Sequence, residues 1–217
     1  MTIKKIIFIL LWLSLLVLSV VSPIKDIKIV LASKNPALLI NLLQRFFGLL
    51  AFTLLFIQIF LGSYMGKLKD IFGGWIFNFH LFNGAIFYTL VLAHPAMYMM
   101  YLYKIKGVLD PFYVYTDLCV LCKGNLEHFY NFGRIALWLI TAGIIAVIFR
   151  GSGTFMKKNW RKFHILNYLA FFLVAIHLRK VGTDALAMPF SAFYWVSLLS
   201  VLLFAGTQFR QALKKER

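Results

Sequence analysis

Long apolar runs, separated by polar or charged connections, divide the chain into six segments. A bilayer core about 30 Å thick is crossed by about 20 apolar residues when they form a helix. The pattern therefore predicts six transmembrane helices, at roughly residues 3–22, 39–64, 75–103, 130–150, 160–179 and 189–209. Only the connection at residues 104–129 is long, and no internal repeat or separate soluble domain is visible. We expect one all-α membrane domain over residues 1–217.

Two details refine this helix assignment. Pro95 lies inside the third segment, where proline removes a backbone hydrogen bond, so we expect a kink or bend there. The first segment follows Lys4 and Lys5, a pattern that a secretory signal peptide also shows. Its apolar run is long for a signal peptide, however, and Pro23 is unfavourable after a cleavage site. We therefore expect residues 3–22 to be retained as a helix.

The composition agrees with a membrane protein. Apolar residues make up 62% of the chain and charged residues 14%, whereas soluble domains have about 45–50% apolar and about 25% charged residues. This difference excludes a soluble enzyme and a disordered chain. The net charge of +16 comes from 23 basic and 7 acidic residues. The basic residues flank the apolar segments and form no continuous stripe, so we expect no nucleic-acid partner.

The distribution of the basic residues predicts the orientation in the membrane. With six helices both chain ends lie on one side, and that side receives 13 of the 23 lysines and arginines. Five of these 13 lie in the short connection at residues 150–162. Basic residues are enriched on the cytoplasmic side of membranes. We therefore expect both termini in the cytoplasm and the chain in the plasma (inner) membrane.

Four of the five histidines lie within the predicted membrane segments. His80 and His94 are on the third segment, and His164 and His177 are on the fifth. An ionisable side chain is costly in a bilayer, so each of these histidines is a candidate for a functional role. The alternative is a structural role, in which the histidine forms a hydrogen bond with a neighbouring helix. The third and fifth segments run in the same direction, so each level of the membrane would contain one histidine from each of them.

Two imidazoles that face each other in an apolar bundle suit the axial ligation of a b-type haem. His80 and His94 are 14 residues apart and His164 and His177 are 13 apart, which corresponds to about 21 Å and about 19.5 Å along a helix. These separations fit two haems. On an ideal helix, however, His177 would lie about 140° away from His164. The fifth helix must therefore be tightened, tilted or locally 3₁₀ between them, or else His177 is not a ligand.

Other metal sites fit these histidines poorly, because no intramembrane carboxylate or thiol accompanies them. The surrounding motifs are Gln-Arg-Phe-Phe-Gly at residues 44–48, His80 through Gly84 to His94-Pro95, Phe-Gly-Arg-Ile-Ala at residues 132–136, Trp-Arg-Lys-Phe-His at residues 160–164, Tyr168 and His177. They resemble the ferric reductase-like transmembrane domains over residues 41–209. These domains occur in NADPH oxidases, in STEAP-type and yeast ferric reductases, and in the haem subunit of a bacterial methionine sulfoxide reductase system.

The resemblance implies a six-helix core with two haem b groups, which carries electrons from a cytoplasmic flavin or nicotinamide donor to an acceptor outside. His80 and His164 would hold the inner haem, and His94 and His177 the outer haem. The chain contains no glycine-rich nucleotide loop after a strand, so FAD or NAD(P)H would act only through a partner. We expect a flavoprotein, a ferredoxin-like protein or a quinol as donor. The acceptor would be ferric iron, dioxygen, a quinone or an extracytoplasmic redox protein.

Two further residues are candidates for the haem sites. Arg45 resembles the basic residue of the second helix that lies near the outer haem in relatives, where it would contact a propionate or stabilise an anion at the acceptor site. The alternative is an interfacial arginine whose charged end reaches the water. Phe87 is seven residues from both His80 and His94, so it would lie between the haems. Ordinary packing is the alternative interpretation of Phe87.

The long outer connection contains Cys119 and Cys122, with Glu127 and His128 shortly after them. Three interpretations stay open. The pair could be a redox-active CxxC disulfide that receives electrons from the outer haem. Cys119, Cys122 and His128 could bind a metal. The pair could also be a structural disulfide in an oxidising compartment.

Two classes of function follow, and both place the chain in a lipid bilayer. The first is an electron-transfer haem protein, which would be the membrane component of an oxidoreductase. The second is a membrane scaffold or transporter whose histidines are structural or relay protons. The second class predicts no haem absorbance, and the chain lacks the intramembrane Asp or Glu that is usual in proton pathways.

Overall fold

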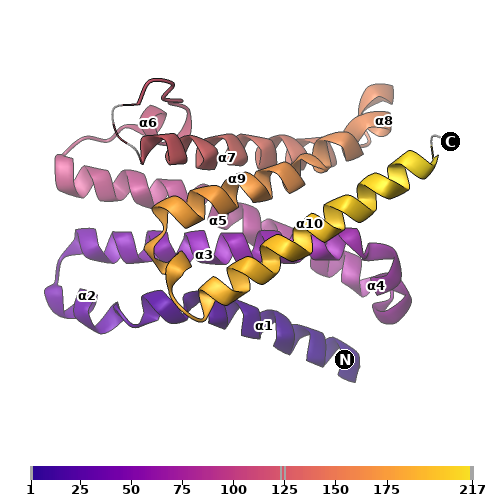
Figure 1. Ribbon diagram of the computed structural model, residues 1–217, viewed down its shortest axis with the longest axis horizontal. Coiled ribbons are helices and arrows are strands. Elements are labelled where there is room, and N and C mark those ends of the chain that lie inside the picture. The colour runs from indigo at the N-terminus through magenta and orange to yellow at the C-terminus, as the bar shows by residue number, and fades with distance from the viewer. Residues whose placement is uncertain (1, 123, 125, 216–217) are drawn as a thin grey trace. The chain divides into compact units, whose positions relative to one another are not determined.

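A computed structural model describes residues 2–122, 124 and 126–215, with side chains described as far as Thr207. All regular elements in this part of the chain are helices (Figure 1). Six of the helical segments are long and apolar enough to cross a membrane, which confirms the six expected spans: Ile3–Ile24, Pro36–Ser63, Trp75–Lys106, Glu127–Ile148, Gly153–Val181 and Phe190–Thr207. The protein is therefore an all-helical, multi-pass type of membrane protein.

The helices form two compact units. The first contains the chain up to Asp110 and the chain from Thr183 onward. Its elements are α1 (Ile3–Ile24), α2 (Ile27–Ser33), α3 (Pro36–Ser63), α4 (Met65–Phe72), α5 (Trp75–Lys106), the 3₁₀ helix η1 (Thr183–Leu186) and α10 (Phe190–Lys215). The second unit, from Pro111 to Gly182, contains α6 (Pro111–Tyr115), α7 (Glu127–Ile148), α8 (Gly153–His164) and α9 (Leu166–Val181).

The central helix of the first unit is α3, which contacts α1, α5 and α10. It begins at Pro36, in the first turn where proline's missing N–H is not needed, and the Asn35 side chain accepts a hydrogen bond from Ala37 N–H at 2.9 Å. Leu54 and Leu61 are 1% and 0% exposed. Because other helices cover several faces of α3, its sequence is apolar all round and not on one stripe only.

The first apolar segment, α1, is packed into this unit. The ring of Phe8 lies edge-on to that of Phe79 of α5, with centroids 5.1 Å apart. Ser19 Oγ and Thr53 Oγ1 of α3 are 2.5 Å apart, and both residues are fully buried. Small polar residues of this kind join helices where water is absent. α1 is therefore a structural part of the first unit.

The third span, α5, is one continuous helix through Pro95. It ends where Gly107 adopts a φ of +72°, the left-handed conformation that closes many helices and that glycine adopts at no steric cost. The bend expected at Pro95 stays a prediction.

The fifth span consists of two helices that meet directly after His164. α8 ends at His164 and α9 begins at Leu166. At the junction Tyr168 N–H donates a hydrogen bond to the carbonyl of Ile165, three residues earlier, at 3.0 Å. Such a bond is of the 3₁₀ type. The fifth span is therefore interrupted between His164 and His177, and the relative orientation of these two histidines stays a prediction.

Candidate functional site

His94 of α5 lies against the first half of α3. Its Nδ1 is 2.9 Å from the carbonyl oxygen of Gln44, and because only a protonated ring nitrogen can donate to a carbonyl, this assigns the proton to Nδ1 and the lone pair to Nε2. Gly48 faces the same ring. A Cβ at Gly48 would lie 2.8 Å from Cε1 and 2.9 Å from Nδ1 of His94, so no larger residue fits there without moving the imidazole.

His177 of α9 has the same surroundings on α7. Its Nδ1 is 2.9 Å from the carbonyl oxygen of Phe129, and a Cβ at Gly133 would lie 3.1 Å from both Cε1 and Nδ1. In α3 and in α7 alike, the glycine follows the bonding carbonyl by four residues. A helical side chain covers the turn that precedes its own Cα. Glycine at this position therefore leaves the carbonyl open to a second hydrogen bond.

The other two histidines are held by side-chain amides. Nε2 of Gln58 donates to the His80 carbonyl at 3.0 Å and lies 3.3 Å from His80 Nε2. Nδ2 of Asn167 donates to the His164 carbonyl at 2.8 Å and lies 3.4 Å from His164 Nδ1. An amide nitrogen carries two N–H groups, so one amide can serve both contacts. His164 also forms a hydrogen bond with the backbone of Gly143.

Gln58 belongs to a chain of hydrogen bonds that joins three helices. Its Oε1 accepts from Asn83 Nδ2 at 2.8 Å, and Asn83 Oδ1 accepts from Trp12 Nε1 at 2.9 Å. Asn83 is fully buried, and its Nδ2 also donates to the Leu54 carbonyl at 3.2 Å. A buried amide is stable only when its polar atoms have partners. The position of His80 is thus coupled to α1 and α3.

All four histidines are half-buried and sit within the membrane-length spans. His80 and His94 belong to the first unit, and His164 and His177 belong to the second. The pairing of one histidine from each unit stays a prediction. Phe87, between His80 and His94 along α5, is 4% exposed, and its two interpretations stay open.

Arg45 has three carboxylate contacts. Its Nε and Nη2 donate to the two oxygens of Asp184 at 2.6 and 2.7 Å, and its Nη1 lies 2.7 Å from an oxygen of Asp26. Ser22 Oγ donates to Asp184 at 2.7 Å. Burial by itself would raise the pKa of Asp184, but these hydrogen bonds and the charge of Arg45 outweigh it and hold that pKa below its usual value.

These contacts show that Arg45 connects α3 with η1 and with the residues that follow α1. Arg45 therefore has a structural role. Its two predicted roles are a contact at a haem propionate or acceptor site and that of an interfacial arginine. Both interpretations stay predictions.

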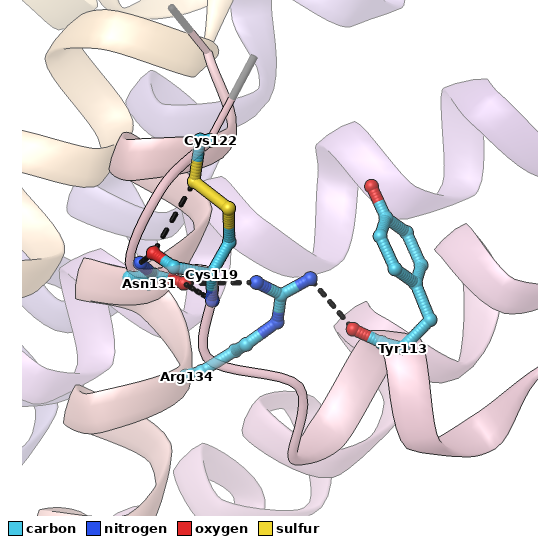
Figure 2. Close-up of a disulfide and its surroundings, with 5 residues drawn as sticks. All are labelled: Tyr113, Cys119, Cys122, Asn131 and Arg134. Carbon is cyan, nitrogen blue, oxygen red and sulfur yellow. Dashed lines mark hydrogen bonds between the residues drawn. A yellow bond between two sulfur atoms is a disulfide. The ribbon is translucent and has the colours of Figure 1, made fainter. Parts of the chain in front are cut away.

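Cys119 and Cys122 form a disulfide in the loop before α7 (Figure 2). The side chain of Asn131, in α7, holds this loop: Oδ1 accepts from Cys119 N–H at 3.2 Å and Nδ2 donates to the Cys119 carbonyl at 2.5 Å. The ligand-type atoms of Cys119, Cys122 and Glu127 lie within 4.8 Å of one another. His128, the third ligand of the predicted metal site, is exposed and does not belong to this close group.

Arg134 is a buried cation beside this loop, with 6% exposure. Its Nη1 donates to Asn131 Oδ1 at 3.1 Å and its Nη2 to the Tyr113 carbonyl at 2.6 Å, and its guanidinium lies 5.0 Å from the centre of the Tyr113 ring (Figure 2). Among the residues that the structure describes, Arg134 has no carboxylate partner. Sequence reasoning missed Asn131 and treated Arg134 only as part of a motif.

Comparisons with known protein families, with curated proteins and with solved structures found no match to this chain. The fold places the chain in the class of all-helical proteins that have six helices long and apolar enough to cross a bilayer. Its distinguishing feature is two helix pairs, α3 with α5 and α7 with α9, that each hold histidines against glycines.

Proposed function

We propose that this chain carries electrons across a membrane through two b-type haems, each held by two histidines. A haem, when bound, supplies iron that accepts and releases one electron at a time. His80 and His164 would hold the inner haem, and His94 and His177 the outer haem. This ligand set follows the resemblance to the ferric reductase-like transmembrane domains.

The observation that carries the proposal is the shared arrangement at His94 and His177. A histidine that binds a metal almost always donates its other ring N–H to a carbonyl or a carboxylate, which fixes the tautomer and the ring orientation. Both histidines donate from Nδ1 to a backbone carbonyl at 2.9 Å and so keep the Nε2 lone pair for an iron ion. Both α3 and α7 provide this arrangement, each with a glycine four residues after the carbonyl.

The surroundings of the other two histidines support the division into two levels. His80 and His164 are each held by an amide that also bonds the histidine's own carbonyl, whereas His94 and His177 are each held by a carbonyl of the neighbouring helix. The match is close for His94 and His177. At His80 the amide of Gln58, on α3, approaches Nε2, whereas at His164 the amide of Asn167, three residues later in the chain, approaches Nδ1. At His80 an iron ion at Nε2 would displace the contact with Gln58, which lies 3.3 Å away.

The proposal includes partners and an orientation. Electrons would come from a cytoplasmic flavoprotein or from a quinol, and would leave to an extracytoplasmic acceptor such as ferric iron, dioxygen or a redox protein. Both termini would be cytoplasmic and the membrane would be the plasma (inner) membrane. The excess of basic residues on the side of the termini supports this orientation.

The test is a reduced-minus-oxidised absorbance spectrum of the purified full chain, with a haem count as the pyridine complex. We expect two b-type haems per chain. His94→Ala should remove one of them, and the matched control His128→Ala, at the exposed fifth histidine, should remove none. A purified chain without haem absorbance, also when produced with added haem, would refute the proposal and favour a scaffold or transporter.

A further inference from the structure

The disulfide between Cys119 and Cys122 closes a very short loop, because the two cysteines are only three positions apart. A disulfide stabilises a fold mainly by restricting the unfolded chain, and this effect is smallest for short loops. The loop is also held already, since Asn131 bonds both the N–H and the carbonyl of Cys119. A purely structural role would therefore add little stability at this position.

The loop is accessible from outside the second unit. Val120 and Leu121, which lie between the two cysteines, are 82% and 93% exposed, and the cysteines themselves are half-buried. Thiol–disulfide exchange needs an attacking thiolate to reach a sulfur atom, so its rate depends on access. Exposed apolar residues beside the sulfurs also offer a contact surface to a protein that carries the attacking thiol.

A buried positive charge lies next to the loop. Arg134 reaches Cys119 through Asn131, whose Oδ1 accepts from both Arg134 Nη1 and Cys119 N–H (Figure 2). No carboxylate among the described residues neutralises this guanidinium. A cation stabilises a thiolate and so makes it a better leaving group in exchange, whereas the Glu127 carboxylate, within 4.8 Å of both sulfurs, opposes this effect.

We propose that Cys119 and Cys122 form a redox-active thiol–disulfide exchange site for an external dithiol protein. A thiolate of the partner attacks one sulfur, a mixed disulfide forms, and the other cysteine leaves as a thiolate. The second thiol of the partner then attacks the mixed disulfide, so that the partner becomes oxidised by two electrons and the cysteine pair becomes reduced by two. The reverse sequence reduces a partner disulfide. The exchange requires no haem and is independent of the electron-transfer proposal.

The first test counts thiols in the folded full chain in detergent. The oxidised chain is equilibrated with a mainly reduced glutathione buffer, quenched with acid, alkylated with a maleimide and analysed by mass. We expect a gain of two alkylated thiols per chain, which is lost again in oxidised glutathione. The double variant Cys119→Ser, Cys122→Ser sets the zero level. A disulfide that opens only after denaturation would overturn the proposal, and so would a reduced pair that binds zinc and can no longer reoxidise.

The second test measures how fast reduced glutathione opens the disulfide. Arg134→Gln should slow this step about threefold, because without the cation the leaving cysteine thiolate is less stable and leaves more slowly. Arg134→Lys, which keeps the charge, should restore most of the rate, and the matched control Arg150→Gln, at an exposed arginine, should leave it unchanged. Circular dichroism checks the fold of each variant. An unchanged rate in a folded Arg134→Gln chain would overturn the role of the charge.

Discussion

Replacement of Gly48 by alanine tests the close fit between α3 and His94. The added Cβ would lie 2.8 Å from Cε1 of His94, so the ring must move away from the Gln44 carbonyl. The lost hydrogen bond costs about 1 kcal/mol, and overpacking costs about 1–3 kcal/mol. The higher helix propensity of alanine returns about 1 kcal/mol. The free energy of unfolding should therefore fall by about 1–3 kcal/mol.

Gly62→Ala is the matched control, because Gly62 lies on the same helix and also faces a histidine. Its Cβ would be 4.0 Å from Cε1 of His80, an ordinary contact distance, so this variant should be unchanged or more stable by up to about 1 kcal/mol. Unfolding in mixed micelles, followed by circular dichroism, measures the stability, and the haem spectrum reports on His94. If Gly48→Ala behaves like Gly62→Ala in both measurements, the close fit at His94 is wrong.

The remaining predictions concern two buried polar groups. Asp184→Asn should lower the free energy of unfolding by about 2–3 kcal/mol, somewhat less than a fully buried ion pair, because Arg45 keeps a second carboxylate partner. The folded state lowers the pKa of Asp184, so the ionised carboxylate stabilises the fold above the ordinary carboxyl pKa. This stabilisation is lost as the pH falls through the lowered pKa. When the free energy of unfolding is measured against pH, it should therefore fall more steeply at acid pH for the wild-type chain than for Asp184→Asn. Asn83→Leu should cost about 2–3 kcal/mol, because it leaves Trp12 Nε1 and other buried polar atoms without their partner. The same unfolding assay should show little change for Asn159→Leu, at a half-buried asparagine whose side chain bonds the Phe155 carbonyl within α8.

The helices could be predicted from the sequence because lipid imposes one rule on the whole chain. In a bilayer every backbone polar group needs an internal partner, so about 20 consecutive apolar residues have to form a helix. The six spans followed from this rule with ends that differ by a few residues. The short elements did not follow, because α2, α4 and α6 depend on local turns such as the one at Gly73, which has a positive φ of +67° at the end of α4.

The histidines of the candidate site were also visible in the sequence, because an ionisable residue stands out in an apolar segment. What holds them was not visible. Gln44 and Phe129 contribute only a backbone carbonyl, which every residue has, and Gly48 and Gly133 act through the absence of a side chain. A usable signal does exist, since a Phe-Gly pair ends four residues after the bonding carbonyl in both helices. It becomes meaningful only when the facing histidine is known.

The first turns of α7 connect the two candidate sites of the second unit. The Phe129 carbonyl accepts the hydrogen bond from His177, and Asn131, two residues later, holds the backbone of Cys119. A substitution at Asn131 removes the side-chain bonds to Cys119, whereas the carbonyl that accepts from His177 belongs to the backbone of Phe129. Cysteine-to-serine changes remove the sulfur chemistry while Asn131 keeps its bonds to the backbone. They therefore separate exchange at the disulfide from the positioning of His177.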